Sequence, residues 1–175
     1  APQARKVRAA PAGPRPVVIF LPGILGSHLK VGEKDRVWFD FFDIARGGLE
    51  KIQYDHLNIS PDGLFKRYYG DLCDYLEDSH DVRRFAYDWR RPLRDEAARL
   101  AAEVERALDA TPLPVRLMTH SMGGLVVRAL IARHRPVWDR LMQRQNAYWV
   151  MLGVPNRGSH LIVETLLGLG DSPRQ

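Results

Sequence analysis

The residues best suited to do chemistry lie in the segment Thr119–Gly124 (THSMGG), with Ser121 near its centre. In a nucleophile elbow, a serine occupies a strained turn between a strand and a helix. The residues two before and two after it must be small, because strand and helix approach closely there. Gly123 meets this requirement, whereas Thr119 stands where glycine is usual. We predict that Ser121 is a nucleophile; the alternative is that it only caps the following helix.

An elbow of this kind needs two backbone N–H groups that stabilise an oxyanion. The N–H of Met122, at the predicted helix start, supplies one of them. The second should come from the segment Leu21–Ser27 (LPGILGS), which follows an apolar strand, and we assign it to the N–H of Ile24. The alternative for this segment is an ordinary Pro-Gly turn, and beside the elbow the two interpretations are comparable.

A serine nucleophile also needs a histidine base and an acid, which follow it in the order serine, acid, histidine in this type of fold. His134 lies about three and a half helical turns beyond Ser121, roughly 20 Å away, and is excluded. His160 could approach the site, but a loop or helix-cap role is commoner for such a residue. His120 is adjacent to Ser121 and cannot turn back to deprotonate it, so we predict that it lines the pocket. We therefore expect the acid and the histidine to lie beyond Gln175, and residues 1–175 alone to be almost inactive.

Alternating apolar runs and helical patterns predict the elements that position these residues. Strands are predicted at 17–21, 81–89, 115–119 and 147–154, and helices at 70–79, from 92 to about 108, and from 122 to about 133. Strands that alternate with helices form right-handed crossovers. The sequence therefore predicts an α/β fold, a mostly parallel sheet with helices on both faces.

Between the first strand and the first helix, residues 28–70 form a predicted insertion, irregular from His28 to about Tyr69. Its segment Val37–Ile44 (VWFDFFDI) is too aromatic for a solvated loop. Trp38, Phe41 and Phe42 should therefore line the acyl site, or else plug the sheet edge, and the sequence favours neither.

Composition narrows the class of protein further. The 175 residues are 45% hydrophobic and 27% charged, with one cysteine and a net charge of +5. A disulfide scaffold is excluded, no apolar run is long enough to span a bilayer, and the scattered basic residues argue against nucleic-acid binding. Residues 1–15 are predicted to be a linker. The histidines lack metal-ligand spacing, so no metal is expected. Without a recognisable signal peptide the localisation is undetermined, with the cytoplasm slightly favoured.

Four segments together resemble the lecithin:cholesterol acyltransferase-like branch of the α/β-hydrolases. They are LPGILGS at 21–27, AYDWR at 86–90, HSMGG at 120–124 and GVPNRGS at 153–159, in the family's order. The resemblance implies that residues 16–175 are the amino-terminal portion of an α/β-hydrolase domain. It places an oxyanion donor in the first segment and the nucleophile in the third, and it makes the insertion a lid or lipid-binding region. It also implies that Asp88, Trp89 and Arg90 anchor the loop that follows them.

The function implied by this resemblance is that of a serine hydrolase or acyltransferase. Such enzymes act on lipid or other carboxylic esters through an acyl-serine intermediate and without a cofactor, so an ester or lipid substrate and peripheral contact with a lipid surface are expected. The alternative is a non-catalytic hydrolase-like domain that binds or regulates. Thr119 departs from the family pattern, and the family's later strands, which carry the acid and the histidine, are absent from these residues.

Overall fold

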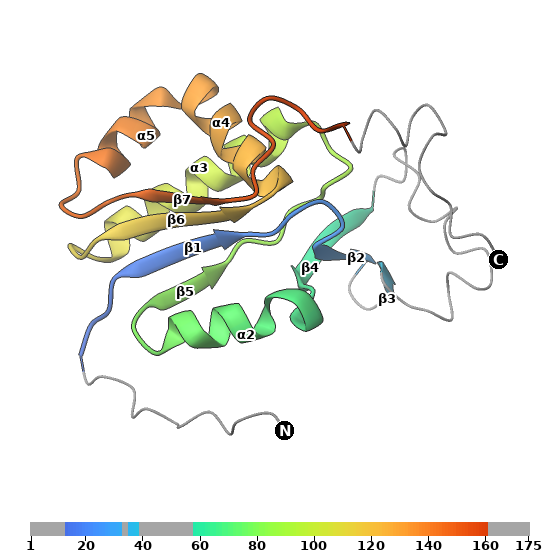
Figure 1. The fold of residues 1–175 in the computed structure, drawn as a ribbon, viewed down its shortest axis with the longest axis horizontal. Coiled ribbons are helices and arrows are strands. Elements are labelled where there is room, and N and C mark those ends of the chain that lie inside the picture. The colour runs from blue at the N-terminus through green and yellow to red at the C-terminus, as the bar shows by residue number, and fades with distance from the viewer. Residues whose placement is uncertain (1–12, 33–34, 39–57, 161–175) are drawn as a thin grey trace.

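The structure, a computed structural model, describes residues 13–32, 35–38 and 58–160 (Figure 1). Its main sheet has four parallel strands in the order β5-β1-β6-β7. The strands are β1 (Val17–Leu21), β5 (Asp81–Arg84), β6 (Val115–His120) and β7 (Trp149–Leu152). The helices are α2 (Lys66–Glu77), α3 (Leu93–Ala110), α4 (Met122–Arg133) and α5 (Arg135–Met142). The predicted α/β architecture is confirmed.

The central strand β1 explains why helices cover both faces of the sheet. All five of its residues are apolar and buried, and successive side chains of a strand point to opposite faces. Ile19 and Leu21 belong to the larger core cluster, which contains residues of α3, α4 and α5, whereas Phe20 packs with Cys73 of α2. Figure 1 shows the same division, with α2 on one side of the sheet and the other three helices on the opposite side.

The long helix α3 supplies much of that larger core. Its buried apolar residues recur every three or four positions, as a single buried helical face requires, and include Ala97, Leu100, Val104 and Leu108. The helix predicted from Pro92 to about Leu108 is confirmed. Pro92 sits immediately before the first turn, and Pro112 and Pro114 follow the last one.

The part of the chain predicted to be irregular contains a second, antiparallel sheet. Its strands are β2 (Ser27–Val31), β3 (Asp35–Trp38) and β4 (Ile59–Leu64), in the order β3-β2-β4. The prediction of an irregular segment here was wrong. It failed because β4 carries Pro61 and Gly63, residue types that usually mark turns in a sequence. Pro61 pairs with Leu29 next to a register shift in the ladder, where a strand tolerates proline. This sheet lies beyond the carboxyl ends of β1 and β5 (Figure 1).

Several element boundaries also differ from those predicted. Helix α2 begins at Lys66, four residues before Gly70, and β5 ends at Arg84, five residues before Trp89. Residues beyond Arg84 leave the ladder because their backbone and side chains bind the loop after β1, as described below. Helix α4 ends at Arg133, and His134 separates it from α5. Within the described residues, no helix combines the length and apolarity needed to cross a membrane.

Candidate active site

Ser121 lies at the junction between β6 and α4, with the backbone geometry of a strained turn. Its φ and ψ angles are 49° and −123°, a conformation that residues other than glycine rarely adopt. Its N–H donates to the carbonyl of Leu152 at the end of β7 (2.9 Å), which fixes the turn to the neighbouring strand. The Ser121 side chain makes no capping hydrogen bond to α4, so the contact expected of a purely structural cap is missing.

Two glycines allow helix α4 to start this close to the sheet. A Cβ atom on Gly123 would lie 2.5 Å from the carbonyl oxygen of Pro22 and 2.9 Å from Cβ of Leu21. A Cβ atom on Gly124 would lie 2.3 Å from a methyl group of Val154. The segments around Pro22 and Val154 therefore pack directly against the first turn of α4, and neither position has room for a side chain.

This packing predicts that Gly123→Ala lowers the free energy of unfolding by about 1–3 kcal/mol, because backbone atoms must move to admit the methyl group. Glycine-to-alanine substitution inside a helix ordinarily stabilises a protein, by up to about 1 kcal/mol. Gly70 in α2 provides the matched control, since its added Cβ would meet nothing closer than Lys66 Cβ at 3.9 Å. Urea denaturation of both variants should therefore give changes of opposite sign. A stabilising Gly123→Ala would contradict the close approach described here.

Thr119, the departure from the expected glycine, is accommodated on the β7 side of the elbow. The residue is fully buried, and its hydroxyl accepts a hydrogen bond from the indole N–H of Trp149 (2.9 Å). The same hydroxyl lies 3.4 Å from the carbonyl oxygen of Val150, to which it donates. The threonine at this position therefore has both a donor and an acceptor partner on β7, which satisfies its buried polar group.

The loop Pro22–Gly26, which joins β1 to β2, lies against the elbow. A Cβ atom on Gly23 would be 2.9 Å from Nδ1 of His120 and 3.1 Å from Cβ of Ser121. The carbonyl of Gly23 accepts a hydrogen bond from the N–H of Gly26 (3.1 Å), which closes a tight turn. The backbone of this loop is thus brought within a few ångströms of Ser121.

The two backbone donors assigned from the sequence, Ile24 and Met122, both belong to segments at this junction. Neither N–H donates a hydrogen bond within residues 13–32, 35–38 and 58–160. The side chains of Ile24 and Leu25 are 54% and 43% exposed, although both are apolar. The junction therefore offers N–H donors next to an apolar surface, an arrangement suited to an oxyanion that carries an acyl chain.

Side chains from the segment after β5 hold both ends of this loop. The buried hydroxyl of Tyr87 donates to the carbonyl of Pro22 (3.0 Å), and burial raises the pKa of Tyr87, which keeps this donor protonated. The backbone N–H of Tyr87 donates to Oγ of Ser27 (3.1 Å), and the indole N–H of Trp89 donates to the Ser27 carbonyl (3.3 Å). Trp89 thus binds Ser27, the residue that follows the loop after β1 and that is distant from Trp89 in sequence.

Asp88 and Arg90 form a buried, bidentate ion pair within the same segment. Arg90 donates from Nε to Oδ1 of Asp88 (2.9 Å) and from Nη2 to Oδ2 (2.7 Å), and the two side chains are only 8% and 2% exposed. Nearby, burial raises the pKa of Glu96, which pairs with Arg99 and accepts the N–H of Asp88. A buried ion pair thus joins Asp88 and Arg90 in the structure.

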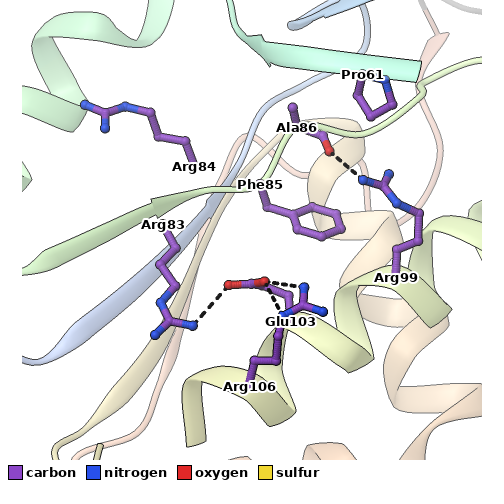
Figure 2. Close-up of a pocket in the computed structure, with 8 residues that line it drawn as sticks. All are labelled: Pro61, Arg83, Arg84, Phe85, Ala86, Arg99, Glu103 and Arg106. Carbon is purple, nitrogen blue, oxygen red and sulfur yellow. Dashed lines mark hydrogen bonds and ion pairs between the residues drawn. The ribbon is translucent and has the colours of Figure 1, made fainter. Parts of the chain in front are cut away.

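A pocket of about 420 Å³ lies elsewhere, at the outer edge of the sheet between β5 and α3 (Figure 2). It is lined by Pro61, Arg83, Arg84, Phe85, Ala86, Arg99, Glu103 and Arg106. Glu103 pairs with Arg83 (3.1 Å) and with Arg106 (2.5 Å), and Arg99 stacks over the Phe85 ring at 5.3 Å. The other two lining arginines, Arg84 and Arg99, pair with Glu77 and Glu96 outside the pocket lining. None of the lining residues belongs to the elbow or to the loop after β1.

The other residues singled out from the sequence are not all brought to this junction. His120 is exposed beside Ser121, with Nδ1 2.9 Å from the hydroxyl of Tyr69. His134 lies just beyond the carboxyl end of the 12-residue helix α4, about 20 Å along the axis from Ser121, which agrees with its exclusion as a base. His160 is exposed. Trp38 ends β3, and Phe41 and Phe42 lie outside the described residues, as do residues 1–12 of the predicted linker.

Known proteins share both sequence and fold with this chain. A family model described as lecithin:cholesterol acyltransferase matches residues 47–170, which is most of the chain. The chain belongs to the lecithin:cholesterol acyltransferase family. A relative from Arabidopsis thaliana, "Lecithin-cholesterol acyltransferase-like 4", is 23% identical over 200 residues. A crystal structure of a Bacillus licheniformis lipase in its mature form shares the fold, with a TM-score of 0.51 at 18% identity.

These matches cover most of this chain but only part of the other two proteins. The alignments include 86% and 91% of this chain, against 36% of the plant relative and 50% of the bacterial lipase. This member of the lecithin:cholesterol acyltransferase family thus spans between a third and a half of the length of these two proteins, and it has the α/β fold predicted from its sequence.

Three residues that support this junction were not identified from the sequence. Tyr69, Tyr87 and Trp149 hold the loop after β1 or the elbow through hydrogen bonds from distant segments. Tyr87 belongs to the recognised AYDWR segment, which is the one signal that could have pointed to it. Nothing in the local pattern marks Tyr69 or Trp149, since aromatic residues in a helix and in a strand ordinarily indicate packing.

Proposed function

We propose that this protein is a serine hydrolase or acyltransferase of lipid esters in which Ser121 carries the acyl group. The single observation that supports this most is the backbone of Ser121, a strained non-glycine turn at the end of a parallel strand. Strain of this kind is found where the surrounding structure maintains it for a functional reason. Membership of the lecithin:cholesterol acyltransferase family supports the class of substrate.

In the proposed reaction, Oγ of Ser121 attacks the ester carbonyl carbon and loses its proton to a histidine base. The carbonyl oxygen becomes an oxyanion, which the N–H groups of Ile24 and Met122 stabilise. The alcohol then leaves with a proton from the base, and water or a second alcohol releases the acyl group from Ser121. We propose that the base and its acid lie outside the described residues, because His120 is adjacent to Ser121 and His134 is at the far end of α4.

An acyl-enzyme intermediate gives this proposal a direct kinetic test. Full-length protein mixed rapidly with p-nitrophenyl butyrate should release a burst of p-nitrophenol equivalent to its active sites, followed by slower steady turnover. Addition of a long-chain alcohol then separates the two reaction types, because an acyltransferase forms a new ester whereas a hydrolase forms only the acid. Absence of both burst and turnover would favour the non-catalytic, binding alternative.

The aromatic residues Trp38, Phe41 and Phe42 are proposed to contact the acyl chain. Replacing Phe41 and Phe42 with serine should then reduce kcat/KM for decanoate esters at least about tenfold more than for acetate esters, because each buried methylene contributes about 0.8 kcal/mol. Tyr75→Ser, at an exposed aromatic residue of α2, is the control and should leave the ratio unchanged. A uniform loss at all chain lengths with a lower melting temperature would assign the two phenylalanines to the core instead.

A further inference from the structure

We propose that Tyr69 is a positioning residue for the reaction at Ser121, because its hydroxyl fixes both the loop that carries the Ile24 N–H and the ring of His120. This inference rests on the proposed function, but it assigns a role that neither the sequence pattern nor the family comparison indicates. Tyr69 lies in α2, 46 residues from Gly23 and 51 residues from His120.

The first contact of Tyr69 is with the backbone of the loop. The N–H of Gly23 donates to the Tyr69 hydroxyl oxygen at 2.9 Å, and the Gly23 carbonyl accepts the N–H of Gly26 at 3.1 Å. The Gly23 carbonyl and the Ile24 N–H belong to the same planar peptide group and point in opposite directions. Hydrogen bonds on both sides of Gly23 therefore restrict the direction in which the Ile24 N–H can point.

The second contact of Tyr69 is with the residue next to the nucleophile. Its hydroxyl lies 2.9 Å from Nδ1 of His120, and the two ring centroids are 5.8 Å apart. A phenol oxygen that accepts the Gly23 N–H still has its own hydrogen to donate, and a neutral imidazole nitrogen accepts it. Burial raises the pKa of Tyr69, so the hydroxyl keeps that hydrogen at neutral pH. One hydroxyl thus links the loop to the elbow.

The ring of Tyr69 is itself held in place by close packing. It lies 5.3 Å from the ring of Phe20 on β1, and a Cβ atom on Gly26 would be 2.9 Å from its Cε2 atom. The loop is thus confined between the Tyr69 ring and the His120–Ser121 segment. Because these packing contacts involve the ring and not the hydroxyl, removal of the hydroxyl should leave the ring in position and release only the two polar contacts.

Loss of the Tyr69 hydroxyl should change kcat rather than the binding of the ester. An oxyanion donor stabilises the transition state more than the bound ester, so a misdirected Ile24 N–H lowers kcat and leaves KM nearly unchanged. Displacements of about 1 Å at a reacting group can reduce rates about a hundredfold. We therefore expect Tyr69→Phe to reduce kcat for p-nitrophenyl butyrate by about 10- to 100-fold.

The experiment compares Tyr69→Phe with Tyr68→Phe in the full-length protein. Tyr68 is the neighbouring residue on α2 and is 73% exposed, so loss of its hydroxyl should change kcat less than twofold. Active sites are titrated with a fluorophosphonate, which corrects kcat for misfolded protein. Butylboronic acid, which forms a tetrahedral adduct with an active serine, serves as a transition-state mimic. Its inhibition constant should rise in Tyr69→Phe by a factor similar to the fall in kcat, with KM changed less than threefold.

The outcomes separate this inference from the function on which it rests. If Ser121→Ala turns over substrate as fast as wild type, the proposed function fails, and the role of Tyr69 fails with it. If turnover depends on Ser121 but Tyr69→Phe keeps the wild-type kcat per titrated site, only the positioning role is overturned. A rise in KM at constant kcat would equally overturn it, because it would show a contact with the substrate in place of an effect on the oxyanion donor.

Discussion

Ser121→Ala is expected to reduce kcat for p-nitrophenyl butyrate by roughly 10⁴-fold or more in the full-length protein, with no loss of folded structure. The reason is that the oxyanion donors and the binding surface remain, while the atom that forms the acyl bond is removed. Initial rates at saturating substrate measure the effect, and the melting temperature reports on folding. Alanine keeps the Cβ atom, and therefore the same backbone strain, and the Ser121 side chain makes no capping hydrogen bond, so stability should stay close to that of wild type.

Ser79→Ala is the matched control for this experiment. Ser79 follows α2 and immediately precedes His80, at the amino-terminal end of β5, whereas Ser121 lies beyond the carboxyl end of β6. Its replacement should leave kcat within about twofold of wild type, as expected for a surface position. If Ser121→Ala and Ser79→Ala were equally active, the nucleophile would have to be sought elsewhere in the protein.

Asp88→Asn is expected to lower the free energy of unfolding by about 3 kcal/mol. Removal of one partner from a buried ion pair costs about 3–5 kcal/mol, because it leaves a buried charge without its compensation. We expect the low end of this range, since Asp88 also repels the nearby carboxylate of Glu96 and raises its pKa, and asparagine relieves that repulsion. Urea denaturation of the wild-type and variant proteins gives the difference.

The control for this prediction is the same substitution in an exposed pair. Asp139 and Arg135 lie 2.7 Å apart, as do Asp88 and Arg90, but their side chains are 48% and 67% exposed. Asp139→Asn should therefore cost no more than about 0.5 kcal/mol. Equal losses in the two variants would mean that burial does not set the strength of the Asp88–Arg90 pair. The account of how the segment after β5 supports the site would then be wrong.

The main sheet could be predicted from the sequence because its patterns are strong and local. β1 is a continuous apolar run, as expected for a strand buried on both faces, and α3 has a regular apolar spacing over its whole length. The antiparallel sheet could not be predicted in the same way. Pro61 and Gly63 interrupt β4, and the strand is maintained by pairing with β2 rather than by its own pattern.

The candidate site, like the fold, could be predicted only in part from the sequence. Ser121, Met122 and Ile24 could be proposed from the sequence because a nucleophile elbow and an oxyanion loop each need a short, characteristic run of residues. Their supports come from elsewhere in the chain: Tyr69 from α2, Tyr87 from the segment after β5 and Trp149 from β7. Side-chain hydrogen bonds between distant segments leave no periodic signal in a sequence, so only the three-dimensional structure brings these residues together.

The most direct test of this account is to find which residue of the full-length protein an alkyl fluorophosphonate modifies. The reagent forms a stable covalent bond with a serine only where a base activates the hydroxyl and an oxyanion site accepts the phosphoryl oxygen. After proteolysis, mass spectrometry should locate the adduct on Ser121, and labelling should disappear in Ser121→Ala. Modification of a different residue, or equal labelling of the wild-type and Ser121→Ala proteins, would contradict the assignment of Ser121 as the nucleophile.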